Sequence, residues 1–434
     1  MKHKWLFLVV PLVVVFIVVE GFLLKLDLSR INQGTGNSNA FPIMRITLNG
    51  TDLDEIHANS KEIKYEGNDL ELVVGDETLS FTDVQIKGRG NSTWDWDKRP
   101  YQIKFKNKVD LLGLGPRKKY ILLANAYDDS MIRNALMFKM TEMIEEKYRV
   151  KGEFVELDID GGYLGLYYLT TKVEIGKNSV DLRDKYGILV ELDTMRRDDE
   201  DCVVTSFNEC LVVKDAVFED DEEILAEATE DFLHNYNKLE SAAKKGDFNK
   251  VKKYIDVQSF AEYYLISEFA VNPDAFVSSF FYYKNGKDDV IHAGPLWDYD
   301  FAFSNRGWSD SIDKSFYSPT DTVIWKKRAY SGRKANTDIS KLLFYLMDIP
   351  EFRAEVERVF QDKLSGRKSE LLMWTIQEGA RIKNVAMKDS ERWGKNELVF
   401  YSEMKYLLDW LSKRYDYIEE EYGEKEWQYT PGVI

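Results

Sequence analysis

Hydrophobic and polar residues alternate with a period of two through much of the first half of the chain. The runs IMRITL, LELVV and FTDVQIKG, within residues 43–87, are separated by the turn-forming sequences NG, GND and GDE. This pattern predicts a meander of β-strands. Further strands are expected at 101–106, at 119–125 and at 187–194, and the segment 154–173 reads as a hairpin that turns at its Gly-Gly pair.

The period changes to that of a helix in one early segment and again from about residue 219. Residues 129–147 have apolar residues at helical spacing, with Asp129 or Ser130 as the expected N-cap. The same periodicity covers 219–245, 257–272 and most of 339–422, with a strand pair between 279 and 297. We therefore expect an α+β fold with a β-rich N-lobe at 43–216, a mostly helical C-lobe at 217–425 and a tail at 426–434.

The N-terminus carries a long apolar run behind basic residues. Residues 5–24 contain one acid, Glu20, and follow Lys2 and Lys4. Such a run is long enough to cross about 30 Å of hydrocarbon, and the preceding positive charge keeps the N-terminus cytoplasmic. We expect a single-pass signal anchor at 1–25, a linker at 26–42 and an extracytoplasmic remainder on the cell membrane. A cleaved signal peptide is the alternative, although no small-x-small cleavage site follows.

Cysteine usage and charge narrow the choices further. Cys202 and Cys210 flank a hairpin expected to turn near 206–208, which would set the two thiols opposite one another for a disulfide. With two Cys and four His in the chain, a Cys/His zinc centre is not favoured. The formal net charge of −16 argues against a nucleic-acid partner, since phosphate neutralisation needs a basic surface, and it is otherwise typical of a soluble surface.

The first candidate for chemistry is the stretch GRGNSTW at residues 88–94. Gly88 and Gly90 leave backbone amides accessible, and Asn91, Ser92 and Thr93 add side-chain donors. A concentration of donors of this kind suits a phosphate group. The spacing matches neither a P-loop nor a dinucleotide-binding fingerprint. A structural turn capped by Asn91 is the alternative.

The strand that follows supplies a lysine. In an extended 101–106 segment, Gln102 and Lys104 share one face, and Lys104 could reach back to phosphates covered by the glycine loop. An exposed lysine on an edge strand explains Lys104 nearly as well.

Three carboxylates lie at the edges of apolar segments in the second half. Asp298 and Asp300 in GPLWDYDFAF are two residues apart, so in a strand they would point the same way and clamp a divalent ion. Asp274 lies at an expected helix end, before Ser-Ser, where a general base for a hydroxyl could be presented. Carboxylates bordered by apolar residues are usually paired or metal-bound, and helix or turn capping is the alternative.

Together these features follow the logic of a protein-kinase-like phosphotransferase. A glycine loop and a lysine in a β-rich lobe precede an aspartate and a paired-aspartate motif in a helical lobe. The usual kinase sequences HRD and DFG are absent.

Several longer stretches are similar to the spore-coat protein H (CotH) kinase family. They are GRGNSTWDWDKRPYQIKF, LLANAYDDSMIRNAL, FVELDIDGGYLGLYYLTTKVEIGKNSVDL, GILVELD, NPDAFVSSFFYYKN and GPLWDYDFAF, in the family's order from about residue 45 to 305, with weaker likeness to about 420. The resemblance implies an atypical two-lobed kinase fold. It also implies ATP-dependent phosphorylation of Ser, or Thr, in a surface or coat protein in an exported setting, with Mg²⁺ or Mn²⁺.

The resemblance also implies roles for particular residues. Arg89, Gly90 and 91–93 would belong to the nucleotide loop, and Lys104 would contact the nucleotide phosphates. The catalytic aspartate would be Asp274, and the metal would be held by Asp298 and Asp300. Arg133, in SMIRNAL, falls in a family motif without an assigned role.

The chain departs from the family at one position, and two other functions stay open. Where many members read LLTEKV, this chain reads YLTTKV, with Thr171 in the acidic place, so Glu174 would have to substitute if that acid pairs with the nucleotide lysine. Because the family also includes adhesive surface ligands, a non-catalytic, pseudokinase-like coat-assembly module is one alternative. A polysaccharide-acting enzyme with spaced acids is another, but it leaves the glycine loop and Lys104 without a task.

Overall fold

The structure is a computed structural model of the 434-residue chain. It describes residues 41–90, 92–194, 201–272, 274, 277–305, 319–320, 340–396 and 398–423. The residues from Phe41 onward form one compact unit.

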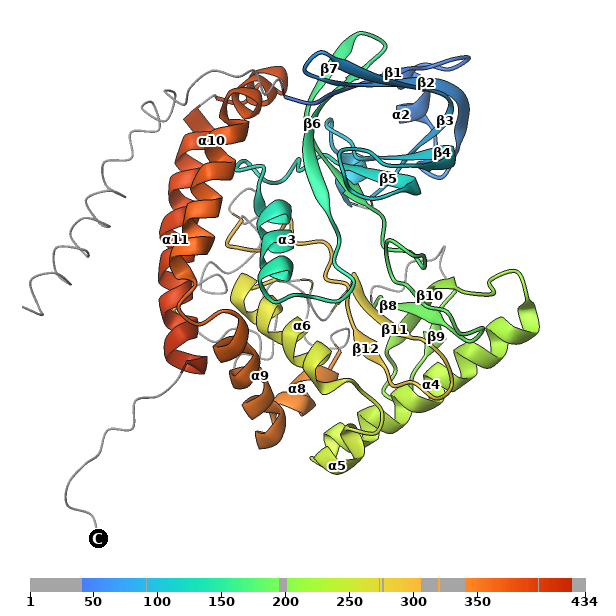
Figure 1. Ribbon diagram of the computed structural model, residues 1–434, viewed down its shortest axis with the longest axis vertical. Coiled ribbons are helices and arrows are strands. Elements are labelled where there is room, and N and C mark those ends of the chain that lie inside the picture. The colour runs from blue at the N-terminus through green and yellow to red at the C-terminus, as the bar shows by residue number, and fades with distance from the viewer. Residues whose placement is uncertain are drawn as a thin grey trace, which may run out of the picture. The chain divides into compact units, whose positions relative to one another are not determined.

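The first seven strands close into a barrel (Figure 1). Their order is β1-β2-β3-β4-β5-β7-β6, antiparallel except where β1 pairs with β6 in parallel. Alternate side chains point inward and form a core of their own, as in β4, where Tyr101, Ile103 and Phe105 are buried. The strands are β1 (Ile43–Thr47), β2 (Tyr65–Val74), β3 (Glu77–Gly88), β4 (Tyr101–Val109), β5 (Arg117–Leu123), β6 (Gly152–Ile159) and β7 (Gly162–Thr171).

The strands expected in this region are confirmed, and one short helix was not expected. Helix α2 (Leu53–Ala58) begins where the Asp52 side chain accepts a hydrogen bond from the backbone N–H of Glu55, and it buries Ile56. An Asp followed by Glu three residues later is a capping-box pattern, so the sequence did contain a signal for this helix.

Five further strands form a second sheet, in the order β12-β11-β8-β10-β9. At its centre β8 pairs antiparallel with β11, so that strands from the two halves of the chain lie side by side. The strands of residues 188–216, expected to belong with the N-terminal strands, are therefore in a different sheet from the barrel. The members are β8 (Ile188–Leu192), β9 (Val203–Val204), β10 (Cys210–Ala216), β11 (Phe280–Lys284) and β12 (His292–Ala293).

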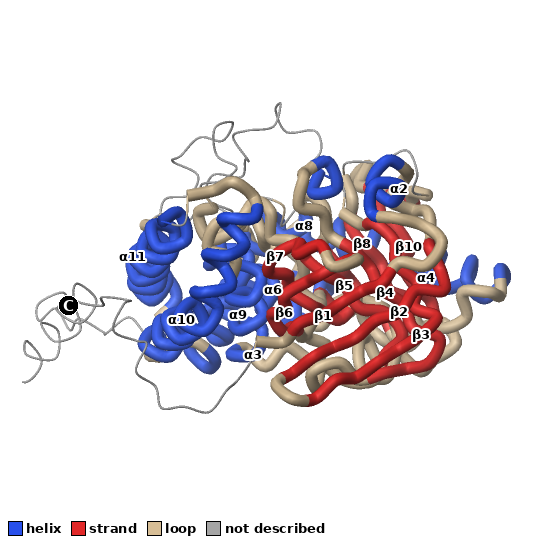
Figure 2. Tube along the Cα trace, turned by 90° about the horizontal axis from the view of Figure 1, so that it is seen from above, coloured by secondary structure: helices blue, strands red, loops and turns tan. Residues whose placement is uncertain are grey.

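Helices make up most of the rest of the described chain, as the periodicity predicts. In Figure 2 α9, α10 and α11 lie together on one side of the barrel strands, whereas α4 lies at the opposite end near β10, and α10 packs against both α11 and β7. The helices are α3 (Arg133–Met143), α4 (Glu222–Lys244), α5 (Phe248–Val251), α6 (Val257–Ala270), α8 (Leu342–Met347), α9 (Pro350–Lys363), α10 (Lys368–Arg392) and α11 (Leu398–Tyr422). The mixed α+β class is thus confirmed.

The expected N-cap of α3 is wrong. The helix begins at Arg133, and the N-cap position is Ile132, without a side-chain hydrogen bond. Asp128 instead accepts hydrogen bonds from the backbone N–H groups of Ser130 and Arg133, at 2.9 and 2.8 Å. The Asp128 carboxylate thus accepts a hydrogen bond from the first residue of the helix, although Asp128 lies further upstream than the usual N-cap position.

Membrane anchoring was predicted for residues 1–25, which lie outside the described residues. Within the part of the chain that the structure describes, no helix combines the length and the apolar character needed to cross a bilayer. The anchor therefore stays a prediction.

The hairpin around the two cysteines has the expected disulfide but not the expected register. Cys210 pairs with Val204 across β9 and β10, so Cys202 lies just beyond the paired residues. The Cα atoms of Cys202 and Cys210 are nevertheless 5.4 Å apart, within the usual range for a disulfide, and the two are bonded.

The tip of this hairpin is held by a buried carboxyl group. Glu240 of α4 accepts hydrogen bonds from the hydroxyls of Thr205 and Ser206, at 3.1 and 3.2 Å. Burial, followed by the negative charge of the neighbouring Glu209, raises the pKa of Glu240 from 4.5 to about 8. The folded protein therefore retains this proton at a pH where the unfolded chain has lost it.

The raised pKa of Glu240 predicts a loss of stability as the pH rises from about 4.5 to 8, because more protons are bound in the folded state over that range. In Glu240→Gln this loss should be smaller by about 1–3 kcal/mol between pH 5.5 and 8.5. Urea unfolding of both proteins at the two pH values measures the effect. A parallel decline in the two proteins would contradict the assignment.

Candidate functional site

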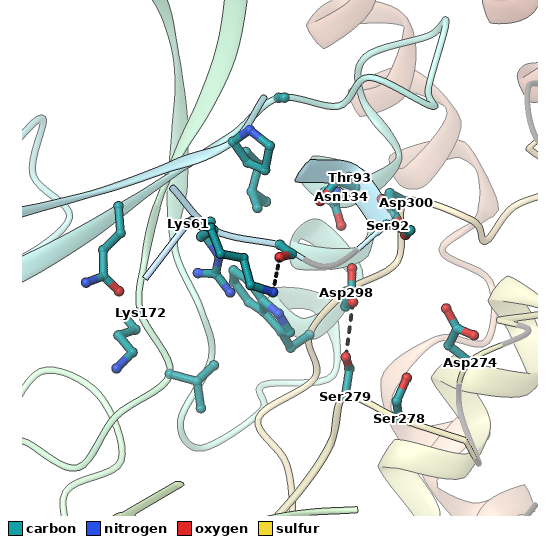
Figure 3. Close-up of a pocket in the computed structure, with 18 of the residues that line it drawn as sticks. Lys61, Ser92, Thr93, Asn134, Lys172, Asp274, Ser278, Ser279, Asp298 and Asp300 are labelled. Atoms are coloured by element: carbon teal, nitrogen blue, oxygen red, sulfur yellow. Dashed lines mark hydrogen bonds between the residues drawn. The ribbon is translucent and has the colours of Figure 1, made fainter. Parts of the chain in front are cut away.

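A cavity of about 600 Å³ brings together the two stretches that the sequence singled out (Figure 3). Arg89, Gly90, Ser92 and Thr93 line it from the β3–β4 connection, and Asp274, Asp298 and Asp300 line it from the second half of the chain. Asn91 lies outside the described residues. The glycine loop and the WDYD motif, more than two hundred residues apart in sequence, thus contribute to one cavity.

The two glycines determine the shape of the glycine loop. A Cβ atom on Gly88 would lie 2.4 Å from the ring of Trp94, and Gly90 has a φ of +81° that a side chain would strain. After Gly90 the chain enters a single 3₁₀ turn, Ser92–Asp95. Lys61 donates a 2.7 Å hydrogen bond from Nζ to the Gly90 carbonyl, which fixes the loop from outside the motif.

The two tryptophans of the motif support the loop. Trp94 packs edge-on against His57 and Tyr101, and the Arg99 guanidinium lies 4.8 Å from its ring centre. Trp96 contacts Tyr127, whose ring is 4.9 Å from that of Phe301 just after WDYD. The aromatic residues of the motif therefore have a packing role, and neither Trp94 nor Trp96 lines the cavity.

Gly88→Ala should distort this loop. The added methyl group would overlap the Trp94 ring, and overpacking of this kind costs about 1–3 kcal/mol. Gly176→Ala is the matched control, because a Cβ there would meet nothing within 4 Å. Chemical unfolding of the two variants should show a loss of stability for Gly88→Ala alone. Equal stabilities would contradict the expectation, because they would show that the Trp94 ring moves aside at little cost.

Asp298 and Asp300 both line the cavity, but the expected reason was wrong. They lie in a turn rather than in a strand, and Asp298 has a φ of +69°. Ser279 donates a 3.0 Å hydrogen bond from its hydroxyl to Oδ2 of Asp298, drawn in Figure 3. A non-glycine residue held at positive φ inside a cavity is the kind of local strain that functional sites retain.

The carboxyl group of Asp300 is surrounded by other acids. Its side chain is buried, and burial followed by the charges of Asp298, Asp274 and Asp128 raises the pKa of Asp300 well above its usual range. Buried carboxylates that repel one another are stabilised by a bound cation.

The expected position of Asp274 agrees with the structure. Helix α6 ends at Ala270 and is capped by Val271 in the left-handed conformation, and Asp274 follows in the next turn. Its backbone N–H donates to Oδ1 of Asn272 at 3.1 Å, and its side chain is buried at the edge of the cavity. In the view of Figure 3 Asp274 lies on the side opposite Lys172, with Asp298 between them.

The carboxylates fit a divalent cation that also binds phosphate. Among the residues the structure describes, no three His, Cys, Asp or Glu side chains are grouped closely enough to form a complete metal site. Magnesium commonly takes only one or two protein carboxylates and completes its shell with phosphate oxygens and water. Asp298 and Asp300 could supply those two ligands.

Lys104 does not line the cavity. On β4 it pairs with Gln85 and Lys119, whereas Gln102 pairs with Lys87, and both Gln102 and Lys87 line the cavity. The alternation of side chains correctly placed Lys104 on the same face of β4 as Gln102. Lys104 lies two residues further along the strand and does not reach the cavity.

The lysine that the sequence analysis missed is Lys172, which lines the cavity directly after β7. Burial, followed by repulsion from Lys119, lowers the pKa of Lys172 to about 8. Arg89 is a second cation of the cavity, 5.3 Å from the ring centre of Trp297. The sequence signal that could have identified Lys172 is its position in YLTTKV, directly after Thr171, where this chain departs from the family's sequence.

The two residues discussed at that departure lie outside this cavity. Thr171 is buried in the barrel, where its hydroxyl accepts a 3.1 Å hydrogen bond from the Lys151 N–H. Glu174 forms a 3.2 Å salt bridge with Lys119 and lines a neighbouring cavity. Glu174 also favours the charged form of Lys172, although more weakly than burial opposes it.

Comparison with known protein families supports the sequence resemblance. The model of the CotH kinase protein family matches residues 86–418, most of the chain and both sides of the cavity. This protein belongs to the CotH kinase family. No curated protein matches it at a significant level.

In this CotH kinase family member, the buried side chain of Arg133 in the SMIRNAL motif contacts several elements that are distant in sequence. Its guanidinium forms ion pairs with Asp128 and with Glu403 of α11. It also donates hydrogen bonds to the carbonyls of Phe303 and Ser304, each at 3.4 Å. These two residues follow WDYD and have φ values of +51° and +54°. Arg133 therefore positions the end of the turn that carries Asp298 and Asp300.

Proposed function

We propose that this protein is an ATP-dependent protein kinase that transfers the γ-phosphoryl group to a Ser or Thr hydroxyl of a surface or coat protein, with Mg²⁺ or Mn²⁺. The observation that carries the proposal is one cavity that is lined by the glycine loop, by basic side chains that include Arg89 and Lys172, and by the carboxylates of Asp274, Asp298 and Asp300. This is the set of groups that phosphoryl transfer requires, since catalysis there consists mostly of positioning and charge stabilisation.

The residues that line the cavity would have different roles in phosphoryl transfer, according to their chemistry. The backbone of the loop at 88–93 would cover the phosphates, and Arg89 and Lys172 would offset their negative charge. Asp298 and Asp300 would hold the metal ion, which supplies charge neutralisation at the phosphates when bound. Asp274 would orient the acceptor hydroxyl and take its proton.

The proposal also assigns roles to the barrel, to the second sheet with its helices and to the N-terminus. The barrel would act as the N-lobe of an atypical kinase, and the second sheet with its helices would act as the C-lobe. Residues 1–25 would anchor the protein in the cell membrane and place the kinase outside the cytoplasm. The support for the anchor is the apolar run in the sequence.

Incubation of the full chain with γ-labelled ATP, Mg²⁺ or Mn²⁺ and serine-rich peptides tests the proposal. We expect label on the peptide or on the protein itself, none after chelation of the metal, and a loss of about 10³-fold in Asp274→Asn with ATP binding retained. Binding of ATP without transfer by the unaltered protein would favour the pseudokinase-like alternative. Absence of ATP binding would exclude both.

A further inference from the structure

A second cavity, of about 640 Å³, adjoins the first. Lys172 and Lys214 line both cavities, so the two adjoin at these side chains. The second is formed by β5 and the segment 172–179 on the barrel side and by β10 and the turn into α4 on the other side. Apart from Lys172, none of its lining residues has a role in the function proposed above.

Basic side chains gather around this second cavity in a protein of net charge −16. Of the residues that the structure describes, seven cations line it, and five acids lie mainly on the opposite wall. The cations are Lys108, Arg117, Lys118, Lys119, Lys172, Lys177 and Lys214, and the acids are Glu174, Asp215, Glu219, Asp220 and Asp221. All the cations except Lys214 come from the barrel side, so that wall is strongly positive.

Part of this positive charge is not neutralised within the described residues. Lys119 is paired with Glu174 and Lys214 with Glu191, whereas the exposed Lys108, Lys118 and Lys177 form no salt bridge in the described part of the chain. Among the described residues that line this wall, these three lysines outnumber its one acid, Glu174.

Arg117 forms the inner part of the same wall. It is 5% exposed, and it donates hydrogen bonds to the carbonyls of Lys172 and Asn178, which fix the guanidinium in place. Its Nε has no hydrogen-bond partner among the described residues. A fixed guanidinium surrounded by lysines is the arrangement that recognises a phosphoryl dianion.

We propose that the second cavity binds a phosphorylated serine of the acceptor polypeptide, one that an earlier transfer has already modified. The inference rests on the proposed function, which places the acceptor hydroxyl in the adjoining cavity. A segment entering both cavities would place its phosphoserine against the basic wall and its next hydroxyl near Asp274. The acids at 219–221 then face any basic residues that flank the phosphoserine. Such a protein would prefer acceptors that are already partly phosphorylated.

Binding of two synthetic serine peptides to the full chain tests this inference, one with a single phosphoserine and one without. We expect the phosphopeptide to bind at least tenfold more tightly by fluorescence anisotropy. The double variant Lys118→Glu/Lys177→Glu should remove that preference. The control Lys106→Glu/Lys253→Glu makes the same charge change at exposed lysines outside the cavity and should retain it.

The remaining outcomes separate this inference from the proposed function. Equal binding of the two peptides would overturn it, as would inorganic phosphate competing at the same concentration as the phosphopeptide, since the cavity would then recognise only the free ion. A loss of ATP affinity in the Lys118→Glu/Lys177→Glu variant would also overturn it, because the cavity would then belong to the nucleotide site. Selective phosphopeptide binding without any phosphoryl transfer would refute the kinase activity and leave the phosphoserine site standing.

Discussion

Replacing Asp298 with asparagine should abolish metal-dependent ATP binding and lower phosphoryl transfer by about 10³-fold or more. The substitution keeps the size of the side chain, and its amide can still accept the hydrogen bond from Ser279. What it removes is the negative charge that a divalent ion needs in a cavity that already contains Arg89 and Lys172. Calorimetric titration with ATP, in the presence and absence of Mg²⁺, measures the binding.

Asp97→Asn is the matched control for Asp298→Asn. Asp97 is exposed, lies in the connection between β3 and β4, and does not line the cavity. It should leave ATP affinity within about twofold of the unaltered protein, because exposed charges away from a site contribute little. Equal metal dependence in Asp298→Asn and the unaltered protein would remove Asp298 from the metal site.

The second large effect is expected from Lys172→Met. Removal of this cation should reduce kcat/KM for ATP by about 10²-fold, roughly 3 kcal/mol of lost stabilisation. Lys104→Met removes the same charge from β4 outside the cavity and should change kcat/KM by less than about threefold. Steady-state kinetics with varied ATP compare the two variants. A larger loss in Lys104→Met would restore the original sequence prediction.

The pH dependence gives an independent test of Lys172. Because the pKa of Lys172 is lowered to about 8, the free protein loses this positive charge as the pH rises through 8. ATP affinity should therefore decline above that pH. In Lys172→Met the decline should be absent, since the titrating group is gone.

The contrast between Lys104 and Lys172 shows what the sequence could and could not predict. Alternation of side chains established that Gln102 and Lys104 share a face of β4. How far along the strand the cavity extends depends on the pairing of β4 with β3 and β5, which a single sequence does not encode locally. The same limit applies to β8, which was expected as a strand but whose partner β11 lies in the second half of the chain.

The grouping of the candidate residues was predicted better than the local structure that brings them together. Gly90, Thr93, Asp274 and Asp298 were chosen for their chemistry, and all four line one cavity. The expected strand geometry of WDYD was wrong, because tertiary contacts hold that turn. One of them comes from Arg133, whose own motif gave no indication of its partners. Contacts between residues more than 160 positions apart are invisible to local patterns.

The central claim is that the loop at 88–93 and the turn at 297–300 jointly hold a metal-bound triphosphate. A crystal structure of the full chain with Mn²⁺ and a non-hydrolysable ATP analogue tests it most directly, because manganese is located by its anomalous scattering. We predict manganese at Asp298 and Asp300, with the phosphates against Gly90 and Lys172. Manganese bound elsewhere, or an analogue outside this cavity, would contradict the account.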